Sequence, residues 1–264
     1  MKVLITSGGT SEKIDQVRKI SNSATGRLGS LIADAFLEFP DTEVTYICSE
    51  NAVLPESGKA RIWYIEDVQS LKLTLETELR NQKYDAVIHA MAVSDYTVKY
   101  SISADALAEY LSRALLQETN FMEADFPKTG EELTAKIQEA LIAYEEKQKA
   151  GKISSEIENL FLSLEKTPKV IHILKQLQPD MILVGFKLLS DVKEEELLQA
   201  AHDLMKKNKC DFVLANDKKN IDSRQHAGVL IGADGSLQYL HTKQEIAQAI
   251  VQAVRDKTGK EQTT

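Results

Sequence analysis

A short polar segment near the amino terminus has the composition of an anion-binding turn. Ser7, Gly8, Gly9 and Thr10 directly follow the apolar run of residues 3–5, and such a run is typical of a buried strand. In an open α/β sheet, ligands bind at the carboxyl ends of the strands. Small residues let a backbone approach a phosphate closely, and backbone amides at a helix start bind it. A simple tight turn is an equally good explanation of the Gly-Gly pair when it is taken alone.

A second polar segment follows within a few residues. Residues 15–26 carry an Asp, an Arg, an Asn and several hydroxyl side chains, and apolar residues at helical spacing follow over residues 28–36. Arg18, Lys19 and Arg27 give the same turn positive charge. The segment matches neither G-x-G-x-x-G nor G-x-x-x-x-G-K-[ST], so the two common nucleotide fingerprints do not apply. Because a mere connection needs far fewer polar side chains, the segment predicts a ligand site.

The elements that would position these residues alternate between strand and helix. Hydrophobic patterns predict further strands at residues 43–48, 62–65, 84–90, 157–162, 181–186 and 211–214, and helices at 68–82, 192–207 and 246–254. This alternation predicts an α/β fold with a doubly wound, mainly parallel, Rossmann-like sheet. Residues 228–231 and 237–240, joined by an Asp-Gly turn, predict a C-terminal β-hairpin. We expect a single domain over residues 1–264, with a helical insertion at about 101–150 and a flexible tail at about 256–264.

Composition excludes several classes of protein. Of the 264 residues, 43% are hydrophobic and 27% charged, as in an ordinary soluble globular protein. No run approaches the roughly 20 apolar residues of a membrane helix, and no signal sequence precedes the first strand, so we expect a cytoplasmic protein. The net charge of −8 argues against nucleic-acid binding. Cys48 and Cys210 are interpreted as core residues rather than as a redox or metal pair.

Three short motifs follow one another along the chain. The first is T-S-G-G-T followed by I-D-x-V-R-x-I-S-N-x-x-x-G-x-x-G, at residues 6–10 and 14–29. The second is A-V-S-D-Y at residues 92–96, and the third is A-N-D at residues 215–217. Each motif alone is weak, but their order over more than two hundred residues is specific, and it resembles that of one known family, the phosphopantothenoylcysteine synthetases, also called phosphopantothenate–cysteine ligases. The resemblance is good over residues 1–96 and 151–254 and poor between them.

The resemblance implies an activity and its reactants. In the family, the carboxylate of 4′-phosphopantothenate attacks the α-phosphate of a nucleoside triphosphate, usually CTP in bacteria, and cysteine then displaces the nucleotide from the acyl nucleotide. It also implies Mg²⁺ bound with the triphosphate, a homodimer whose substrate loop reaches the neighbouring subunit's site, and a place in coenzyme A biosynthesis. This chain lacks the flavin-binding decarboxylase half that many bacterial relatives carry upstream, so the resemblance implies the stand-alone bacterial form. Whether CTP or ATP is used stays open.

The resemblance also assigns residues. The catalytic candidates are Asn22, whose amide would hydrogen-bond the acyl carbonyl of the substrate, and Lys152, on a flap that closes over the triphosphate. The substrate-binding candidates are Arg18, Asn22, Ala24, Gly26, Ala92 and Asp95. The nucleotide-binding candidates are Ser7, Gly8, Gly9, Ala90, Met91, Asp95, Lys152, Pro168, Lys169, Val170, Ile171, Phe186, Lys206 and Lys207.

Structural explanations stand beside several of these roles. Asp95 fits a turn cap, Lys152 a solvent-exposed lysine after Gly151, and Phe186 a core residue. Lys206 and Lys207 would complement the dipole at the end of their helix, and the motif does not decide which of them would meet the nucleotide.

Further residues near the motifs are read as structural, and parts of the chain depart from the family. Asn216 and Asp217 are interpreted as organisers of the site loop, and His89 as a core histidine. Thr167 stands where the family has Asn, residues 187–189 replace its A-x-E, and the segment 101–150 is longer than in bifunctional relatives.

Two other classes of function stay open. A nicotinamide-dependent reductase would share the doubly wound sheet, but the dinucleotide fingerprint is missing. The pair Tyr239 and Lys243 has the spacing of the short-chain dehydrogenases, yet we expect Tyr239 in a strand and Lys243 beyond a helix cap, so it is discounted. A non-enzymatic nucleotide-binding module would need the same binding residues without turnover.

Overall fold

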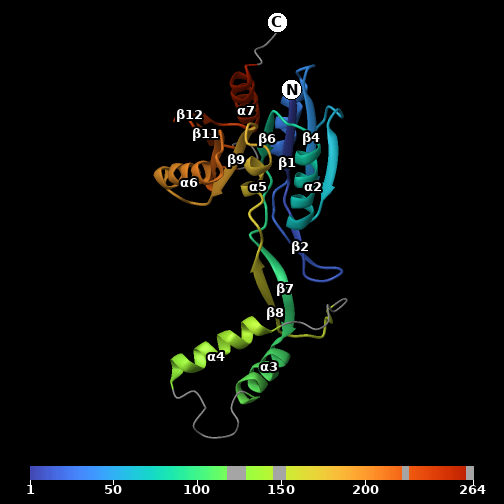
Figure 1. The fold of residues 1–264 in the computed structure, drawn as a ribbon, viewed down its shortest axis with the longest axis vertical. Helices are drawn as coiled ribbons and strands as arrows, with labels where there is room; N and C mark the ends of the chain where they lie inside the picture. Colours follow the sequence, from blue (N-terminus) through green and yellow to red (C-terminus); the bar gives the residue numbers. More distant parts are fainter. Residues whose placement is uncertain (118–128, 145–152, 222–225, 260–264) are drawn as a thin grey trace. The chain divides into compact units, whose positions relative to one another are not determined.

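The chain forms two compact units (Figure 1). The computed structural model describes residues 1–117, 129–144, 153–221 and 226–259. The first unit comprises residues 1–12, 21–95 and 167–264, and the second comprises residues 13–20 and 96–166. Each unit is therefore built from segments that are distant in the sequence.

The first unit contains an eight-stranded sheet in its described part, with the order β12-β11-β10-β9-β6-β1-β4-β5. The neighbours from β5 to β10 pair in parallel, whereas β11 and β12 add an antiparallel hairpin at one edge. This is the predicted doubly wound sheet. The strands are β1 (Lys2–Ser7), β4 (Glu43–Ser49), β5 (Arg61–Ile65), β6 (Ala86–His89), β9 (Ile182–Leu189), β10 (Phe212–Asp217), β11 (Gly228–Gly232) and β12 (Leu237–Leu240).

Strand β1 lies at the point where the order of the strands reverses. The chain builds outward from β1 to β4 and β5, then returns to β6 on the other side of β1 and continues to β9 and β10. In sheets of this type, ligands bind outside the carboxyl ends of the two strands at the reversal. The carboxyl ends of β1 and β6 are therefore the expected place for a site.

Helices cover both faces of the sheet and explain the apolar strands. Val3 and Ile5 face a core shared with α1 (Arg27–Leu37) and α7 (Lys243–Thr258), whereas Leu4 faces a core shared with α2 (Val68–Asn81), α5 (Ile171–Leu177) and α6 (Glu194–Asn208). All three side chains are fully buried. A strand buried on both faces reads as a continuous apolar run, which is why residues 3–5 show no alternation. In the described part of the chain, no helix is long and apolar enough to cross a membrane.

Caps set the ends of several helices. Asp67 accepts a hydrogen bond from the Ser70 amide and forms a capping box before α2, and the Thr242 side chain caps α7 by accepting from the Glu245 amide. Helix α7 continues to Thr258 and ends at Gly259, whose φ of 66° is the left-handed conformation that glycine favours. The helix is thus longer at both ends than the predicted 246–254, and residues 256–258 of the expected tail are helical.

The second unit combines a hairpin and two helices. Strands β7 (Tyr96–Ser103) and β8 (Leu160–Lys166) pair in antiparallel, with an irregularity between Val98 and Tyr100. Helices α3 (Ala104–Gln117) and α4 (Gly130–Ala143) form the expected helical pair. Tyr144, which follows α4, packs against both β7 and α3. The centroid of its ring lies 4.5 Å from that of Tyr100 on β7 and 4.8 Å from that of Tyr110 on α3. Strand β7 was not predicted.

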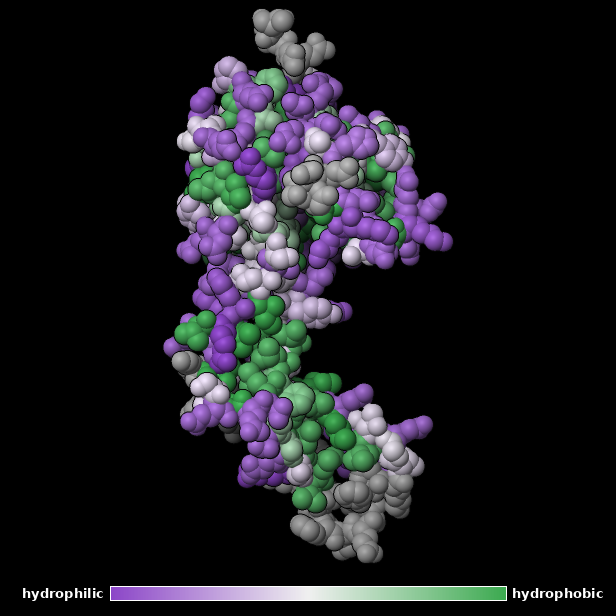
Figure 2. All heavy atoms as spheres, turned by 180° about the vertical axis from the view of Figure 1, so that it is seen from behind, coloured by the Kyte–Doolittle hydropathy of each residue, from purple (hydrophilic) through white to green (hydrophobic). Residues whose placement is uncertain are grey.

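One face of this hairpin is apolar. Val98, Leu160, Leu162 and Leu164 project to the same side of the two strands, as their pairing register requires. Leu164 keeps 45% of its surface exposed. Figure 2 shows that hydrophobic residues gather over this unit. Apolar surface of this kind is characteristic of an interaction site.

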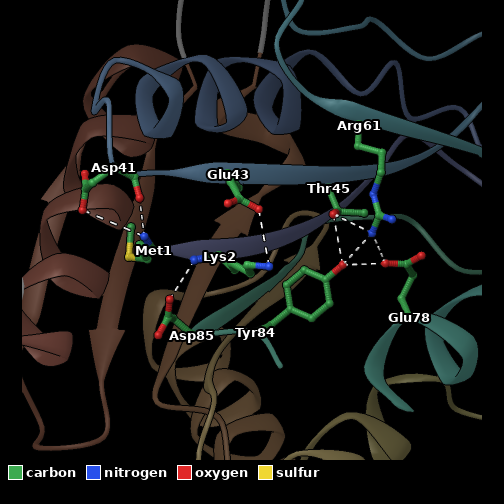
Figure 3. Close-up of polar contacts among 9 residues, drawn as sticks. All are labelled: Met1, Lys2, Asp41, Glu43, Thr45, Arg61, Glu78, Tyr84 and Asp85. Atoms are coloured by element: carbon green, nitrogen blue, oxygen red, sulfur yellow. Dashed lines mark hydrogen bonds and ion pairs between the residues drawn. The ribbon is translucent and has the colours of Figure 1, made fainter. Parts of the chain in front are cut away.

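The amino-terminal edge of the large sheet carries a network of polar contacts (Figure 3). Tyr84 donates to Glu78 over 2.6 Å, and Arg61 donates to Glu78, Thr45 and Tyr84. Glu78 and Tyr84 are buried, and burial raises the pKa of Tyr84 to about 12. A pocket of about 380 Å³ lies beside Arg61 and Thr45. Because these groups satisfy one another at the edge opposite the expected site, we interpret the network as structural.

Candidate functional site

The carboxyl ends of β1 and β6 are joined by backbone pairing beyond the strands. The Ala90 amide donates to the Thr6 carbonyl over 3.1 Å, and the Ala92 amide donates to the Gly8 carbonyl over 2.9 Å. Thr10 continues the ladder, since its amide donates to the Ala92 carbonyl over 3.1 Å. Two motifs that lie more than eighty residues apart in the sequence thus form one continuous surface.

Asn22 fastens a third segment to this surface. Its backbone amide donates to the Thr10 carbonyl over 3.2 Å. Its side-chain Nδ2 donates to the Ala92 carbonyl over 3.0 Å and to Ser94 Oγ over 3.1 Å. Since a carbonyl only accepts, Nδ2 rather than Oδ1 must face Ala92. The structure therefore brings the predicted residues Asn22 and Ala92 into direct contact.

The glycines of the first motif are needed for packing inside the protein. A Cβ atom at Gly9 would lie 2.8 Å from the Asn22 carbonyl oxygen and 2.9 Å from its Cβ. At Gly8, where φ is 84°, it would lie 2.7 Å from Ser49 Oγ. Ser7, Gly8 and Gly9 are buried. Gly9 is needed because Asn22 lies directly on it, and Gly8 because of its positive φ and the close approach of Ser49.

The loop after Asn22 leads into helix α1. Ala24 is exposed, and Gly26 has a φ of 77° as the residue before the helix. Ser7 Oγ donates to the Gly26 carbonyl over 3.0 Å. The predicted residues Ser7, Gly26 and Asn22 thus belong to one folded turn at the carboxyl edge of the sheet.

A fourth segment, residues 167–169, contacts the loop that follows β6. Thr167 donates through its hydroxyl to the Ser94 carbonyl over 2.5 Å and through its amide to the Asp95 carbonyl over 3.0 Å. Lys169 Nζ forms an ion pair with the carboxylate of Asp95. Both charged side chains are more than half exposed, so the pair contributes little to stability and is accessible to a ligand. Pro168 lies between these two contacts, so the structure brings Asp95, Pro168 and Lys169 together.

Four other predicted nucleotide-binding residues lie in the hydrophobic core or against it. Val170 and Met91 are buried in the core, and Ile171 and Phe186 are partly buried against it. Helix α5 begins at Ile171. The pKa of His172 is lowered by burial and then by the charges of Lys207 and Lys169. Of Lys206 and Lys207, Lys207 is the one whose charge acts on His172 in the described residues.

Arg18 lies in the second unit, where it forms a clamp with Asp15. Arg18 Nη2 and Nε donate to Asp15 over 2.6 and 3.0 Å, and Nη2 also donates to the Ile153 carbonyl over 3.0 Å. The Ile153 amide donates to Asp15 over 3.1 Å. The hydrogen bond from Arg18 holds the pKa of Asp15 well below its usual range. Lys152, the residue before Ile153, lies outside the described residues.

His89 is a buried neutral residue at the end of β6. Its Nδ1 lies 2.8 Å from Thr6 Oγ1, and its side chain is buried. Burial lowers the pKa of His89 to about 4. The structure confirms the interpretation of His89 as a core histidine.

The A-N-D motif organises the loop after β10, as predicted. Asp217 accepts hydrogen bonds from the amides of Lys219, Asp191 and Val192 over 2.9 to 3.2 Å. Asn216 Nδ2 donates to the Ala227 carbonyl over 3.1 Å.

The suspected dehydrogenase pair is absent as a functional unit. Tyr239 lies in strand β12 and donates to Glu194 over 2.6 Å, whereas Lys243 is the first residue of α7.

Sequence reasoning missed three hydroxyl residues. Thr10, Ser94 and Thr167 bind the segments of the site together, although each stands inside or beside a motif that was recognised. Their position just after predicted strands could have indicated them, because a side chain there can reach the neighbouring segment. Within the described ranges, no group of three or more His, Cys, Asp or Glu residues has the arrangement of a metal site.

Comparison with known proteins identifies relatives over nearly all of the chain. The model of the DNA/pantothenate metabolism flavoprotein C-terminal domain family matches residues 1–107 and 108–257. The coenzyme A biosynthesis bifunctional protein CoaBC of Thermococcus kodakarensis is 33% identical over 250 residues, which are 94% of this chain and 49% of that protein. CoaBC of Methanocaldococcus jannaschii is 27% identical over 259 residues, 96% of this chain and 50% of that protein. The chain spans about half the length of these curated relatives.

Solved structures give the same result for the fold. The DNA/pantothenate metabolism flavoprotein from Streptococcus pneumoniae superposes with a TM-score of 0.77 at 34% identity, over 97% of this chain and 99% of that one. The C-terminal domain of a CoaBC protein superposes with a TM-score of 0.65 at 19% identity, over 98% and 96% of the two chains. With its ordered motifs, the joined strand ends and a family match over nearly all its residues, this chain belongs to the DNA/pantothenate metabolism flavoprotein C-terminal domain family.

Proposed function

We propose that the protein acts in coenzyme A biosynthesis and joins cysteine to 4′-phosphopantothenate through an acyl nucleotide. The observation that carries this proposal is the convergence of Asn22, Ala92 and Asp95 at the carboxyl ends of β1 and β6, because these are the substrate-binding positions that the motifs imply. The relatives named for coenzyme A biosynthesis support the same assignment.

The proposed reaction has two steps. The carboxylate of 4′-phosphopantothenate attacks the α-phosphorus of the triphosphate, and pyrophosphate leaves. The cysteine amine then attacks the acyl carbon, the bond from that carbon to the phosphate oxygen breaks, and the nucleoside monophosphate leaves with the electron pair. Neither step needs a nucleophile from the protein, so catalysis consists of positioning and charge stabilisation.

The nucleotide would lie between the loop of Asp95 and the start of α5. Lys169 and Lys207 would meet its phosphates, and Phe186 would contact its base. When the triphosphate binds, Lys169 would exchange its ion pair with Asp95 for a contact with phosphate. We propose CTP as the nucleotide and the cytoplasm as the location. Mg²⁺ would enter bound to the nucleoside triphosphate, as the resemblance to the ligases implies, and no step is assigned to it.

We also propose that the active form is a homodimer. The resemblance to the ligases implies it, and the apolar hairpin face formed by Val98, Leu160, Leu162 and Leu164 supports it. A second copy of the chain would bury these side chains.

The test is pyrophosphate release by the purified protein with Mg²⁺, 4′-phosphopantothenate and either CTP or ATP, with and without cysteine. We expect release that cysteine stimulates and that CTP supports better than ATP. Asn22→Ala should lower it by about 10²-fold or more, as the loss of one preorganised polar contact typically does. A protein that is folded by circular dichroism yet releases no pyrophosphate under any of these conditions would contradict the proposal.

A further inference from the structure

The pocket beside Arg61 and Thr45 lies at the amino-terminal ends of β4 and β5, on the edge of the sheet opposite the candidate site. Its volume of about 380 Å³ is in the range of small-molecule sites. None of the residues assigned to the substrate or the nucleotide lines it. The polar groups of its wall therefore serve a purpose other than the proposed reaction.

Arg61, in the wall of this pocket, is held by only one of its nitrogen atoms. Its Nη2 donates to Thr45, to Tyr84 and to the buried carboxylate of Glu78, as Figure 3 shows. Among the described residues, Nη1 and Nε make no hydrogen bond, and the side chain is 50% exposed. Because a guanidinium group carries five N–H protons, the three on Nη1 and Nε stay available. The network thus fixes a cation in place and leaves most of its donors unused.

The charges around the pocket do not cancel. Glu78 balances Arg61, and Lys2 lies 3.5 Å from the carboxylate of Glu43, which also lines the pocket. Lys59 is a further lining residue, is exposed and forms no ion pair with a described residue. One positive charge is left over, although the whole chain has a net charge of −8. The pocket therefore favours an anion.

Part of the wall is apolar and already in place. Leu37 and Val44 belong to the core, and Phe39 is partly buried against it. The guanidinium carbon of Arg255 lies 3.8 Å from the centre of the Phe39 ring and holds that ring in position. An inorganic ion would leave this surface in water, whereas an anion with an apolar body would cover it.

We propose that this pocket binds a small organic carboxylate. The carboxylate accepts hydrogen bonds from Nη1 and Nε of Arg61 and forms an ion pair with Lys59. Its hydrocarbon body covers the apolar wall at Leu37, Phe39 and Val44. A carboxylate carries one negative charge and matches the single excess positive charge, whereas a phosphate monoester carries nearly two at pH 7. Binding here does not depend on the proposed function.

The test is isothermal titration calorimetry of the full chain at pH 7 with three probes. Hexanoate has the proposed chemistry, hexylamine has a similar hydrocarbon with the opposite charge, and inorganic phosphate has negative charge without hydrocarbon. We expect saturable binding of one hexanoate per chain with a Kd on the order of 1 mM or tighter. Hexylamine and phosphate should bind at least about tenfold more weakly.

Two substitutions locate the binding. Lys59→Met removes the unpaired charge, and Arg61→Lys keeps a positive charge beside Glu78 but loses the planar set of donors. We expect each variant to weaken hexanoate binding by about fivefold or more. Lys193→Met changes an exposed lysine outside the pocket and should leave the Kd unchanged. Circular dichroism checks that each variant is folded, and Lys59→Met carries the test if Arg61→Lys does not fold.

Four outcomes would overturn the inference. They are the absence of saturable hexanoate binding, a Kd that Lys59→Met leaves unchanged, hexylamine binding as tight as that of hexanoate, and phosphate binding as tight as that of hexanoate. The last would mean that the apolar wall takes no part. Since no arm of the experiment measures catalysis, each of these outcomes leaves the proposed function standing.

Discussion

The Ala92 carbonyl orients the side-chain amide of Asn22, and the substitution Asn22→Asp tests this orientation. In Asn22→Asp a carboxylate oxygen would replace Nδ2, 3.0 Å from the Ala92 carbonyl oxygen. Two acceptors would then face each other, and Ser94 would lose a donor. We expect Asn22→Asp to be less stable than Asn22→Ala by about 1 kcal/mol at pH 7, since an unmatched polar pair costs more than a deleted one. Urea unfolding of both variants measures the difference, and equal stabilities would contradict this orientation of the amide.

His89 should make the stability of the protein depend on pH. Burial lowers its pKa in the folded state to about 4, whereas the unfolded chain titrates near 6.5. The unfolded state therefore binds the proton first as pH falls, and stability is lost between pH 6.5 and 4. From this residue alone the free energy of unfolding should be about 2 kcal/mol lower at pH 5 than at pH 7.5.

The variant His89→Gln separates this contribution from that of His226, whose pKa is lowered to about 4 by burial and by Lys243. The free energy of unfolding, measured with urea at pH 7.5 and pH 5, should fall by about 2 kcal/mol less in the variant than in the wild type. A fall of the same size in both would mean that His89 is protonated equally in the folded and unfolded states.

At the scale of elements, the site depends on the close approach of two loops. Gly9→Ala would place a methyl group 2.8 Å from the Asn22 carbonyl oxygen, so the Asn22 loop would have to move. We expect a loss of about 1 to 3 kcal/mol in the free energy of unfolding and an activity loss comparable to that of Asn22→Ala. Gly130→Ala is the matched control, because a Cβ there meets open space at the first residue of helix α4. It should change stability by less than about 1 kcal/mol.

The sequence predicted the elements where hydrophobic periodicity and chain order decide the structure. The apolar run at residues 3–5, the capped helix α2 and the Asp-Gly turn before β12 each have a local physical signal. Strand β7 was missed although its residues alternate between apolar and polar types, which is a local signal of a strand; its partner β8 comes more than fifty residues later. Pairing at that distance is decided by tertiary packing rather than by local preference.

In the candidate site too, contacts between segments distant in the sequence could not be predicted from the sequence. The motifs located Asn22, Ala92 and Asp95 on strand ends. They gave no sign that Thr10 would donate to Ser94, or that Thr167 would hold the backbone of Ser94. Such contacts join segments seventy or more residues apart in the sequence, and their geometry follows only from the assembled sheet.

At the scale of the whole molecule, the proposed homodimer makes a clear prediction. Leu164→Asp would place a charge on the apolar hairpin face, where Leu164 is 45% exposed. If a second copy covers this face, the charge would be buried without a partner, and the dimer should dissociate to monomers at micromolar concentration. Light scattering after size-exclusion chromatography gives the mass directly.

The control for this prediction is Leu73→Asp on helix α2 of the first unit, where the side chain is 62% exposed. This variant should keep the mass of the wild type. Equal dissociation of both variants, or of neither, would exclude the hairpin face as the contact.

The division into two units also determines what an optical experiment on this protein reports. The chain has a single tryptophan, Trp63, on the edge strand β5 of the first unit, half-exposed and with the Arg61 guanidinium 5.8 Å from its ring. Intrinsic tryptophan fluorescence thus follows the first unit and is blind to the second. Moving the fluorophore, with Trp63→Phe and Tyr110→Trp in one chain, would follow the second unit instead. Coincident unfolding midpoints of the two proteins would mean that the units melt as one cooperative body, and separate midpoints would give each unit a stability of its own.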